Sequence, residues 1–216
     1  PAHASVWSAF REGLAYAWNL VPVRLLLPMV ALVSFMATPY QALMPIFAAE
    51  VFAGGAETLG ILIGAAGLGG IGGILGLASR RSMRGLLRWL VAACGSAGVA
   101  LTVFSYSTHL GLSLAMMAIA GAGIVVTVNG IATITLTIVA DEMRGRVSGF
   151  YSMAFLGMYP LGSLAAGALA SWIGAAHTLA AGGVTCLAGA LWLARQLPRL
   201  RHHIRPIYIR LGIIAQ

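Results

Sequence analysis

The sequence predicts an all-α membrane protein with six transmembrane helices. Three observations support this prediction: 60% of the 216 residues are hydrophobic, only 8% are charged, and the apolar residues form six long runs. A soluble domain usually carries about a quarter charged residues. Too few charges remain here to cover a water-facing surface, so a soluble enzyme or binding domain is excluded.

Each run is long enough to cross the bilayer core as a helix, which takes roughly 20 residues. Backbone groups in lipid must be hydrogen-bonded within the segment, and barrel strands would be shorter and alternating. The fourth run is longer than a bilayer requires, so we expect it to tilt, to bend near Asn129–Gly130, or to extend into the cytoplasm. The predicted spans are residues 25–47, 59–78, 86–106, 110–140, 147–172 and 175–194.

The flanking segments divide the chain into three parts. Residues 1–24 are predicted to form a cytoplasmic linker, residues 25–197 the transmembrane bundle, and residues 198–216 a basic cytoplasmic tail. Within the linker, the sequence predicts a short amphipathic helix that lies at the membrane interface. A loosely ordered approach to the first span is the alternative. The helix is indicated by large apolar side chains at helical spacing, namely Trp7, Phe10, Leu14 and Trp18.

All thirteen basic residues are arginines, and they lie on one side of the membrane if six spans alternate. The positive-inside rule then places both termini in the cytoplasm. This pattern is typical of a topology signal and not of a basic nucleic-acid-binding face, so we expect no nucleic-acid partner. The absence of Lys indicates a GC-rich bacterial genome, which predicts a bacterial cytoplasmic (inner) membrane. The groups are Arg11 and Arg24; Arg80, Arg81, Arg84 and Arg88; Arg144 and Arg146; and Arg195, Arg199, Arg201, Arg205 and Arg210.

Small residues recur in the second and fifth runs. Such residues four positions apart lie on one helix face and let helix backbones approach closely in lipid. This pattern predicts either general close packing or helices that slide against a neighbour. The second run has Gly60/Gly64, Gly69/Gly73 and Gly72/Gly76, and the fifth has Gly157, Gly162, Ser163, Ala166 and Gly167.

Two segments resemble a known family. Residues 76–84 (GLASRRSMR) resemble the loop signature of the major facilitator superfamily, although Ser79 stands where that signature usually has Asp. Residues 141–147 (DEMRGRV) and 157–167 (GMYPLGSLAAG) resemble the fourth connection and fifth span of that superfamily's carboxy-terminal half. The likeness is greatest to the bacterial branch of macrolide and enterobactin exporters, and it covers nearly the whole chain.

The resemblance implies that the chain is the carboxy-terminal six-helix half of a twelve-helix secondary transporter, built as two inverted three-helix repeats. Its partners would be the amino-terminal half, the lipid bilayer and a small-molecule substrate such as a drug or siderophore, exported by alternating access. No cofactor is expected. The middle of each span has no charged residue, so a proton antiporter would need a titratable group from the other half or couple otherwise.

Two other function classes remain as alternatives. A six-span membrane enzyme would need a nucleophile with its base or a set of metal ligands, and no such pattern is present in the sequence. We therefore expect neither catalytic residues nor a metal site. A structural six-span unit that associates with itself would also be packed through small residues.

Polar residues at helical spacing mark the candidate substrate site. An amide facing lipid would lack hydrogen-bond partners, so these side chains are expected to face a cavity in the bundle. Hydrogen bonding between helices, worth about 0.6 kcal/mol per contact, is the alternative. The predicted substrate-binding residues are Ser34, Thr38 and Gln41 in the first span, Asn129 and Thr133 in the fourth, and Tyr159 in the fifth.

A compact charged cluster connects the fourth and fifth spans. In the family that the chain resembles, this connection lies at the cytoplasmic gate, so the cluster is predicted to act as a latch that pairs differently in the two access states. A solvated turn with topology-setting arginines is the alternative, because exposed ion pairs stabilise little. The predicted gating residues are Asp141, Glu142, Arg144 and Arg146.

Overall fold

A computed structural model of the chain describes residues 6–80 and 85–210. This part of the chain is helical throughout, apart from short connections, and contains no strand. Two short π-helical segments, η1 and η2, interrupt the first and fifth spans. The helices are α1 (Val6–Asn19), α2 (Val21–Met36), α3 (Tyr40–Ile46), η1 (Phe47–Val51), α4 (Ala56–Ala78), α5 (Leu86–Tyr106), α6 (Leu110–Ile138), α7 (Asp141–Ser152), η2 (Met153–Gly157), α8 (Met158–Ile173) and α9 (Ala175–Arg210).

Six of the described helical stretches are long and apolar enough to cross a membrane, which confirms the predicted fold class. The first combines α2, α3 and η1, and the fifth combines α7, η2 and α8. Several extend beyond the apolar runs because each helix continues into its polar flanks. The six stretches are Val21–Val51, Ala56–Ala78, Leu86–Tyr106, Leu110–Ile138, Asp141–Ile173 and Ala175–Ile209.

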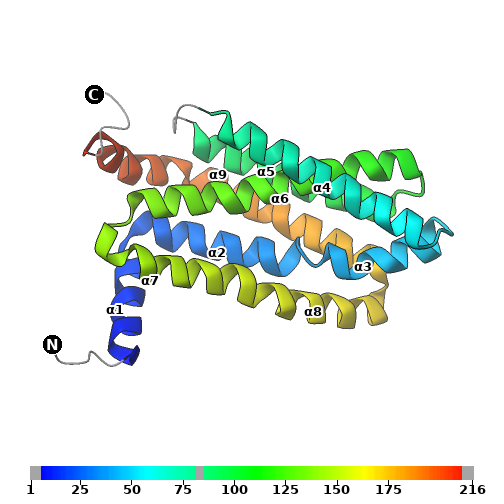
Figure 1. Ribbon diagram of the computed structural model, residues 1–216, viewed down its shortest axis with the longest axis horizontal. Coiled ribbons are helices and arrows are strands. Elements are labelled where there is room, and N and C mark those ends of the chain that lie inside the picture. The colour runs from blue at the N-terminus through cyan, green and yellow to red at the C-terminus, as the bar shows by residue number, and fades with distance from the viewer. Residues whose placement is uncertain (1–5, 81–84, 211–216) are drawn as a thin grey trace.

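The spans lie side by side, and the connections alternate between two ends of the bundle (Figure 1). One end carries α1, the α6–α7 turn, the beginning of α5 and the end of α9, and this end holds the arginine groups. The opposite end carries the α5–α6 and α8–α9 connections and the loop before α4. Arg81 and Arg84 of the predicted groups lie outside the described residues. We call the first end the arginine end.

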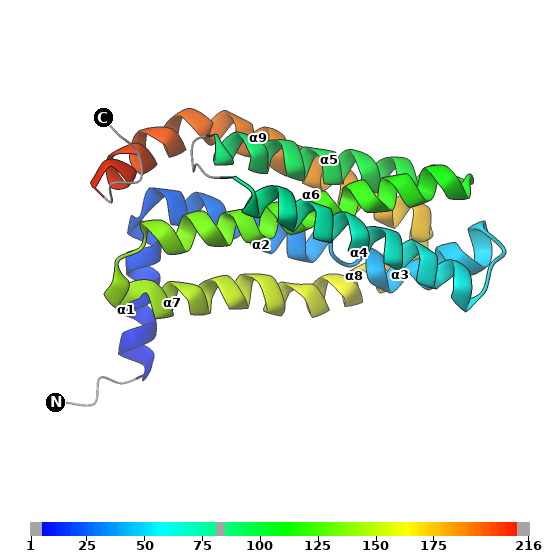
Figure 2. The same cartoon turned by 45° about the horizontal axis from the view of Figure 1, so that its top comes forward.

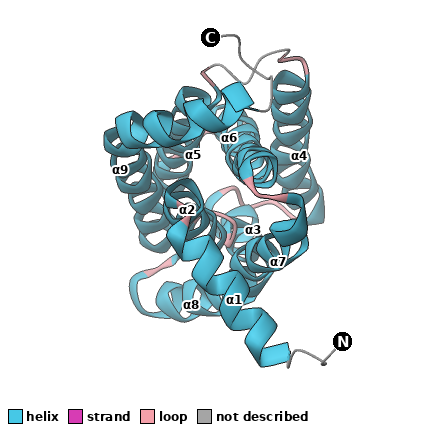
Figure 3. Ribbon diagram, turned by 90° about the vertical axis from the view of Figure 1, so that its left-hand side faces the viewer, coloured by secondary structure: helices cyan, strands magenta, loops and turns pink. Residues whose placement is uncertain are grey.

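Helix α1 crosses the arginine end instead of continuing the direction of α2 (Figures 1, 2 and 3). Ala17 is buried against the bundle, whereas Leu14 and Trp18 are 43% and 62% exposed. Residues 6–19 of the linker are therefore helical, and Leu14 and Trp18 turn an apolar edge outward. Its contact with the membrane interface stays a prediction.

The first span is broken at Ala37–Pro39, which the sequence analysis treated as part of one continuous run. Pro39 has no N–H to donate, so the helical ladder stops there. The N–H of Thr38 donates to the carbonyl of Val33 at 3.1 Å, and the N–H of Tyr40 donates to that of Ala37 at 3.3 Å. The chain then restarts as α3, with Pro39 at its amino end.

Helix α6 runs without interruption through Asn129–Gly130, so the expected bend does not break it. The side chain of Leu90 packs against Gly130, where a Cβ atom would collide with it. α6 forms the centre of the bundle and packs on both α4 and α5.

The contact between α4 and α6 depends on glycine. A Cβ atom on Gly69 or Gly121 would collide with backbone atoms of Ala118 or Ala66, and one on Gly73 would lie 2.8 Å from the carbonyl oxygen of Ala122. The two helices therefore touch backbone to backbone, as small-residue spacing permits in lipid.

Three other glycines of α4, in its amino-terminal half, form an open face. A Cβ atom on Gly60, Gly64 or Gly67 would meet nothing within 4 Å. The fifth span is similarly exposed, since Leu164 and Trp172 of α8 are 73% and 85% exposed. The second and fifth spans are thus the least covered helices in the described structure.

Helix α9 continues through Pro198 and Pro206 to Arg210, beyond the predicted sixth span. Leu200, Ile204 and Tyr208 are buried, so the described part of the segment 198–216 is packed helix.

Replacing Gly121 with Leu in this chain should lower the free energy of unfolding by about 1–3 kcal/mol, because the new side chain forces α6 away from α4. The matched control is Gly67→Leu, which adds the same side chain on the open face and should change stability little. Both values come from SDS titration of the purified chain, followed by circular dichroism. Equal effects of the two substitutions would contradict the described α4–α6 packing.

Candidate functional site

A pocket of about 200 Å³ lies where the first span is broken, and we call it the central pocket. Its wall is supplied by the start of α3, by one face of α6 and by η2. Broken membrane helices are typical of transporter binding sites, because irregular backbone is tolerated where it lines a cavity. The lining residues are Thr38, Tyr40, Gln41, Gly121, Ile124, Val125, Val128, Asn129 and Phe155.

Gln41 presents an amide at the mouth of the broken span. Its Nε2 donates to the hydroxyl oxygen of Tyr40 at 3.4 Å, and its Oε1 accepts from the hydroxyl of Tyr159 at 3.3 Å. Both bonds are long, so the amide is only loosely held and can exchange these partners for a ligand. Tyr159 does not line the pocket, but its hydroxyl donates to Gln41, which does.

Asn129 lies between the central pocket and a second one of about 420 Å³, which we call the side pocket. The side pocket extends toward the arginine end between α4 and α6, and it includes Thr133 and Arg80. Asn129 therefore borders both cavities, whereas Thr133 borders only the side pocket.

The polar side chains of α6 bond within their own helix. Nδ2 of Asn129 donates to the carbonyl of Val125 at 2.9 Å, and the Thr133 hydroxyl donates to the carbonyl of Asn129 at 2.9 Å. Thr137 repeats the pattern with the carbonyl of Thr133 at 2.7 Å. Within the described part of the chain these three residues make no hydrogen bond to another helix, whereas Gln41 and Tyr159 are joined by one between α3 and α8.

Ser34 does not join the other predicted site residues. Its side chain is completely buried, its hydroxyl has no hydrogen-bond partner among the described residues, and it does not line the central pocket. The sequence analysis placed Ser34, Thr38 and Gln41 on one stripe by assuming an unbroken helix, and the interruption at Pro39 changes that register. The hydroxyl of Thr38 donates to the carbonyl of Val33 at 3.2 Å and covers the broken helix end.

The two pockets offer mostly apolar walls with a few amide and hydroxyl groups, and the side pocket adds the guanidinium of Arg80. Such a site suits an uncharged or amphipathic small molecule, since polar groups fix its orientation while apolar contacts supply affinity. Across residues 6–80 and 85–210, no three His, Cys, Asp or Glu side chains lie close enough together to hold a metal ion.

Half of the predicted gating cluster pairs locally. Arg144 forms an ion pair with Asp141 at 2.7 Å, one turn earlier on α7, and its Nε donates to the carbonyl of Leu136 at 3.2 Å. Arg144 thereby caps the last turn of α6 with a cation, which the helix dipole favours. Glu142 is exposed and pairs with no other side chain of the described segments.

Arg146 pairs outside the predicted cluster, with Glu12 of α1 at 2.7 Å. Two further contacts join α1 to the same turn. The N–H of Ala140 donates to the Tyr16 hydroxyl at 3.2 Å, and a Cβ atom on Gly13 would lie 3.1 Å from that of Arg146. The α6–α7 turn is thus fastened to the linker helix. Sequence reasoning missed Glu12 and Tyr16, because nothing local in the sequence signals a contact across more than 120 residues.

A comparison with protein families finds one match, over residues 2–205, to a family model described as transmembrane secretion effector. The matched region begins before α1, includes the first five spans completely and covers the sixth as far as residue 205. No curated protein and no solved structure matches the chain.

Replacing Glu12 with Ala should speed backbone hydrogen exchange in α1 up to about fivefold, because an exposed ion pair contributes about 0.2–1 kcal/mol. The matched control is Asp141→Ala, which removes an ion pair within α7 and should leave exchange in α1 unchanged. Both are measured by mass spectrometry at low salt. If α1 exchanged equally fast in the two variants, the Glu12–Arg146 pair would not hold α1 in place.

Proposed function

We propose, on the premise that this chain belongs to the transmembrane secretion effector family of major-facilitator-type transporters, that it is the carboxy-terminal half of a secondary transporter that exports small molecules. The observation that carries this proposal is the central pocket, where the broken span and the middle of α6 bring together the amides of Gln41 and Asn129, which are 88 residues apart in the sequence. In alternating access such a pocket opens to each side of the membrane in turn.

The uncovered second and fifth spans support the presence of another half. Gly60, Gly64 and Gly67 of α4 offer a surface on which another helix backbone could pack closely, and nothing in the described structure occupies it. α8 exposes Leu164 and Trp172 beside its own small residues. These two spans hold corresponding positions in the proposed inverted repeats, so a pseudosymmetric partner would cover both.

The substrate site is proposed to consist of Thr38, Gln41 and Asn129 on the central pocket, Thr133 on the side pocket, and Tyr159 holding Gln41. Each half of such a transporter supplies one wall of the cavity, so the amides here would meet the substrate from one side. Ser34 is omitted because its hydroxyl is buried away from the pocket.

The orientation follows from charge. The arginine end is proposed to face the cytoplasm of a bacterial cell, with both ends of the chain on that side of the inner membrane. The α6–α7 turn would then lie at the cytoplasmic gate, and Asp141, Glu142, Arg144 and Arg146 would change partners as the gate opens. The pairing of Arg146 with Glu12 extends this proposed latch to the linker helix.

Self-association is a second candidate, favoured by the same open face on α4. Two copies of the chain could cover each other's second and fifth spans through small residues. The two candidates differ in what must be supplied for transport: a distinct amino-terminal half, or only a second copy of this chain.

Reconstituted alone into proteoliposomes, this chain should give no saturable flux of macrolides, dyes or catecholate siderophores. Co-expression with a natural amino-terminal six-span half should restore drug resistance, because that half closes the cavity. A Gly67→Leu variant should reduce this rescue by blocking the interface, although it leaves the isolated chain folded. Saturable flux by the chain alone would contradict the half-transporter proposal and favour self-association.

In the complete transporter, Gln41→Ala or Asn129→Ala should raise the apparent KM for a transported substrate about 2–10-fold, as expected for a lost hydrogen bond of about 0.5–1.5 kcal/mol. The matched control is Thr185→Ala on α9, whose hydroxyl donates only to the carbonyl of Ala181. Expression of all three should stay near normal. Unchanged transport with lower thermal stability in the first two variants would show that these residues serve packing.

A further inference from the structure

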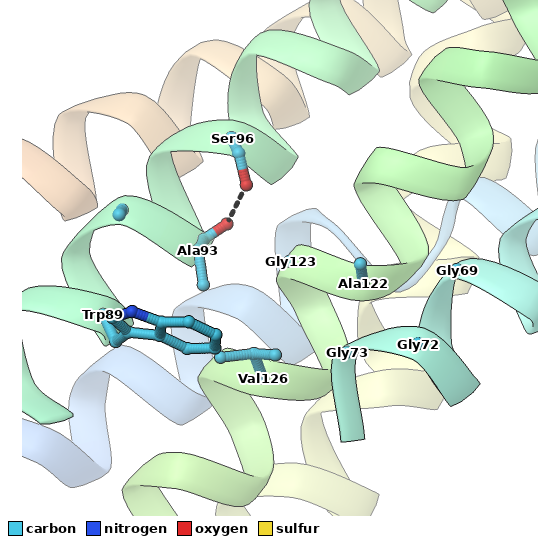
Figure 4. Close-up of a pocket in the computed structure, with 10 residues that line it drawn as sticks. Gly69, Gly72, Gly73, Trp89, Ala93, Ser96, Ala122, Gly123 and Val126 are labelled. Atoms are coloured by element: carbon cyan, nitrogen blue, oxygen red, sulfur yellow. Dashed lines mark hydrogen bonds between the residues drawn. The ribbon is translucent and has the colours of Figure 1, made fainter. Parts of the chain in front are cut away.

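A third cavity lies between α4 and α5, which both pack on α6. It is a groove of about 450 Å³ with α6 at its base, and we call it the α4–α5 groove (Figure 4). We propose that this groove binds one acyl chain of an anionic glycerophospholipid, whose phosphate is held at its rim by Arg80. The residues that line this groove are not among those of the central pocket or the gate, and Arg80 at its rim also borders the side pocket.

The groove exists because its α4 wall has no side chains. Gly69, Gly72 and Gly73 form that wall, and Ala92 and Ala93 of α5 form the facing one. Gly69 and Gly73 are needed for the contact with α6, whereas a Cβ atom on Gly72 would meet nothing within 4 Å. The space beside Gly72 is therefore open to a ligand and not filled by packing.

The lining selects an apolar occupant. Ser96 provides the one side-chain hydroxyl of the groove wall, and it donates to the carbonyl of Ala93 at 2.9 Å (Figure 4). No other lining side chain except the indole of Trp89 carries a polar atom. A water-filled groove would need polar partners for its waters, so a hydrocarbon chain fits these walls better.

The rim at the arginine end carries a positive charge. Trp89 on the first turn of α5 closes this end of the groove, with its ring 3.5 Å from where a Cβ atom on Gly76 would lie. The guanidinium carbon of Arg80 lies 4.7 Å from the centre of the Trp89 ring. A cation stacked on an aromatic ring at the border of an apolar groove complements a phosphate that is attached to an acyl chain.

The groove lies away from the surface proposed for the other half of the transporter. Residues along a helix are rotated by about 100° each, so Gly72, where the groove opens, points about 80–140° away from Gly60, Gly64 and Gly67. A partner that covers the open glycine face therefore leaves the groove facing lipid. Lipids of the leaflet at the arginine end would reach Arg80 with their headgroups, and anionic headgroups are attracted to such basic positions.

The test measures lipid retention by native mass spectrometry. The 216-residue chain is incubated with equal amounts of phosphatidylglycerol and phosphatidylcholine that carry the same acyl chains. Gly72→Leu and Ser96→Leu fill the groove from α4 and from α5, respectively. Gly67→Leu is the matched control, because it adds the same side chain to the open glycine face of α4.

A second pair of variants tests the charge. Arg80→Gln removes the charge at the rim, and Arg195→Gln is its control at the same end of the bundle. Circular dichroism verifies that each variant is folded.

We expect the unmodified chain to retain phosphatidylglycerol at least fivefold over phosphatidylcholine. Each groove-filling variant should lose at least four-fifths of the bound lipid, and Gly67→Leu and Arg195→Gln should lose none. Arg80→Gln should equalise the two lipids. Retention unchanged in both groove-filling variants, or an undiminished preference for phosphatidylglycerol in Arg80→Gln, would overturn the proposal.

Discussion

The bundle depends on the backbone contact between α4 and α6. Lipid offers no hydrophobic force that drives helices together, so their association relies on close packing. Gly69 and Gly73 of α4 and Gly121 of α6 permit that packing because each faces backbone atoms of the other helix. With α4 held on one side, α6 turns another face toward the broken first span, and this face carries Asn129. The same contact leaves the far side of α4 uncovered.

The broken first span converts a membrane crossing into part of a binding pocket. A backbone group without a hydrogen bond costs several kcal/mol in lipid. At the interruption Ala37–Pro39, the carbonyl of Val33 accepts from the N–H groups of both Ala37 and Thr38, so neither donor is left unpaired. The Thr38 hydroxyl adds a third donor to the same oxygen. The chain that restarts at Tyr40 then directs Gln41 toward α8 and the pocket.

The sequence predicted the spans well, because hydrophobic length depends on the bilayer and not on tertiary detail. It also selected Thr38, Gln41 and Asn129, which line one pocket. A polar side chain in an apolar span is costly if it faces lipid, so it tends to face a cavity or another helix. The sequence prediction failed at Ser34 because helical spacing is meaningful only while the helix continues. It could not find Glu12 or Tyr16, since their partners Arg146 and Ala140 are distant in sequence and no periodic pattern connects them.

The attachment of α1 to the α6–α7 turn couples the position of α1 to the junction of the fourth and fifth spans. α1 stands across the arginine end with its amino terminus projecting away from the bundle (Figure 3). α1 contacts the turn through residues in its middle and its carboxy-terminal half, namely Glu12, Gly13 and Tyr16. A displacement of α1 therefore acts directly on the junction of the fourth and fifth spans, through these three contacts.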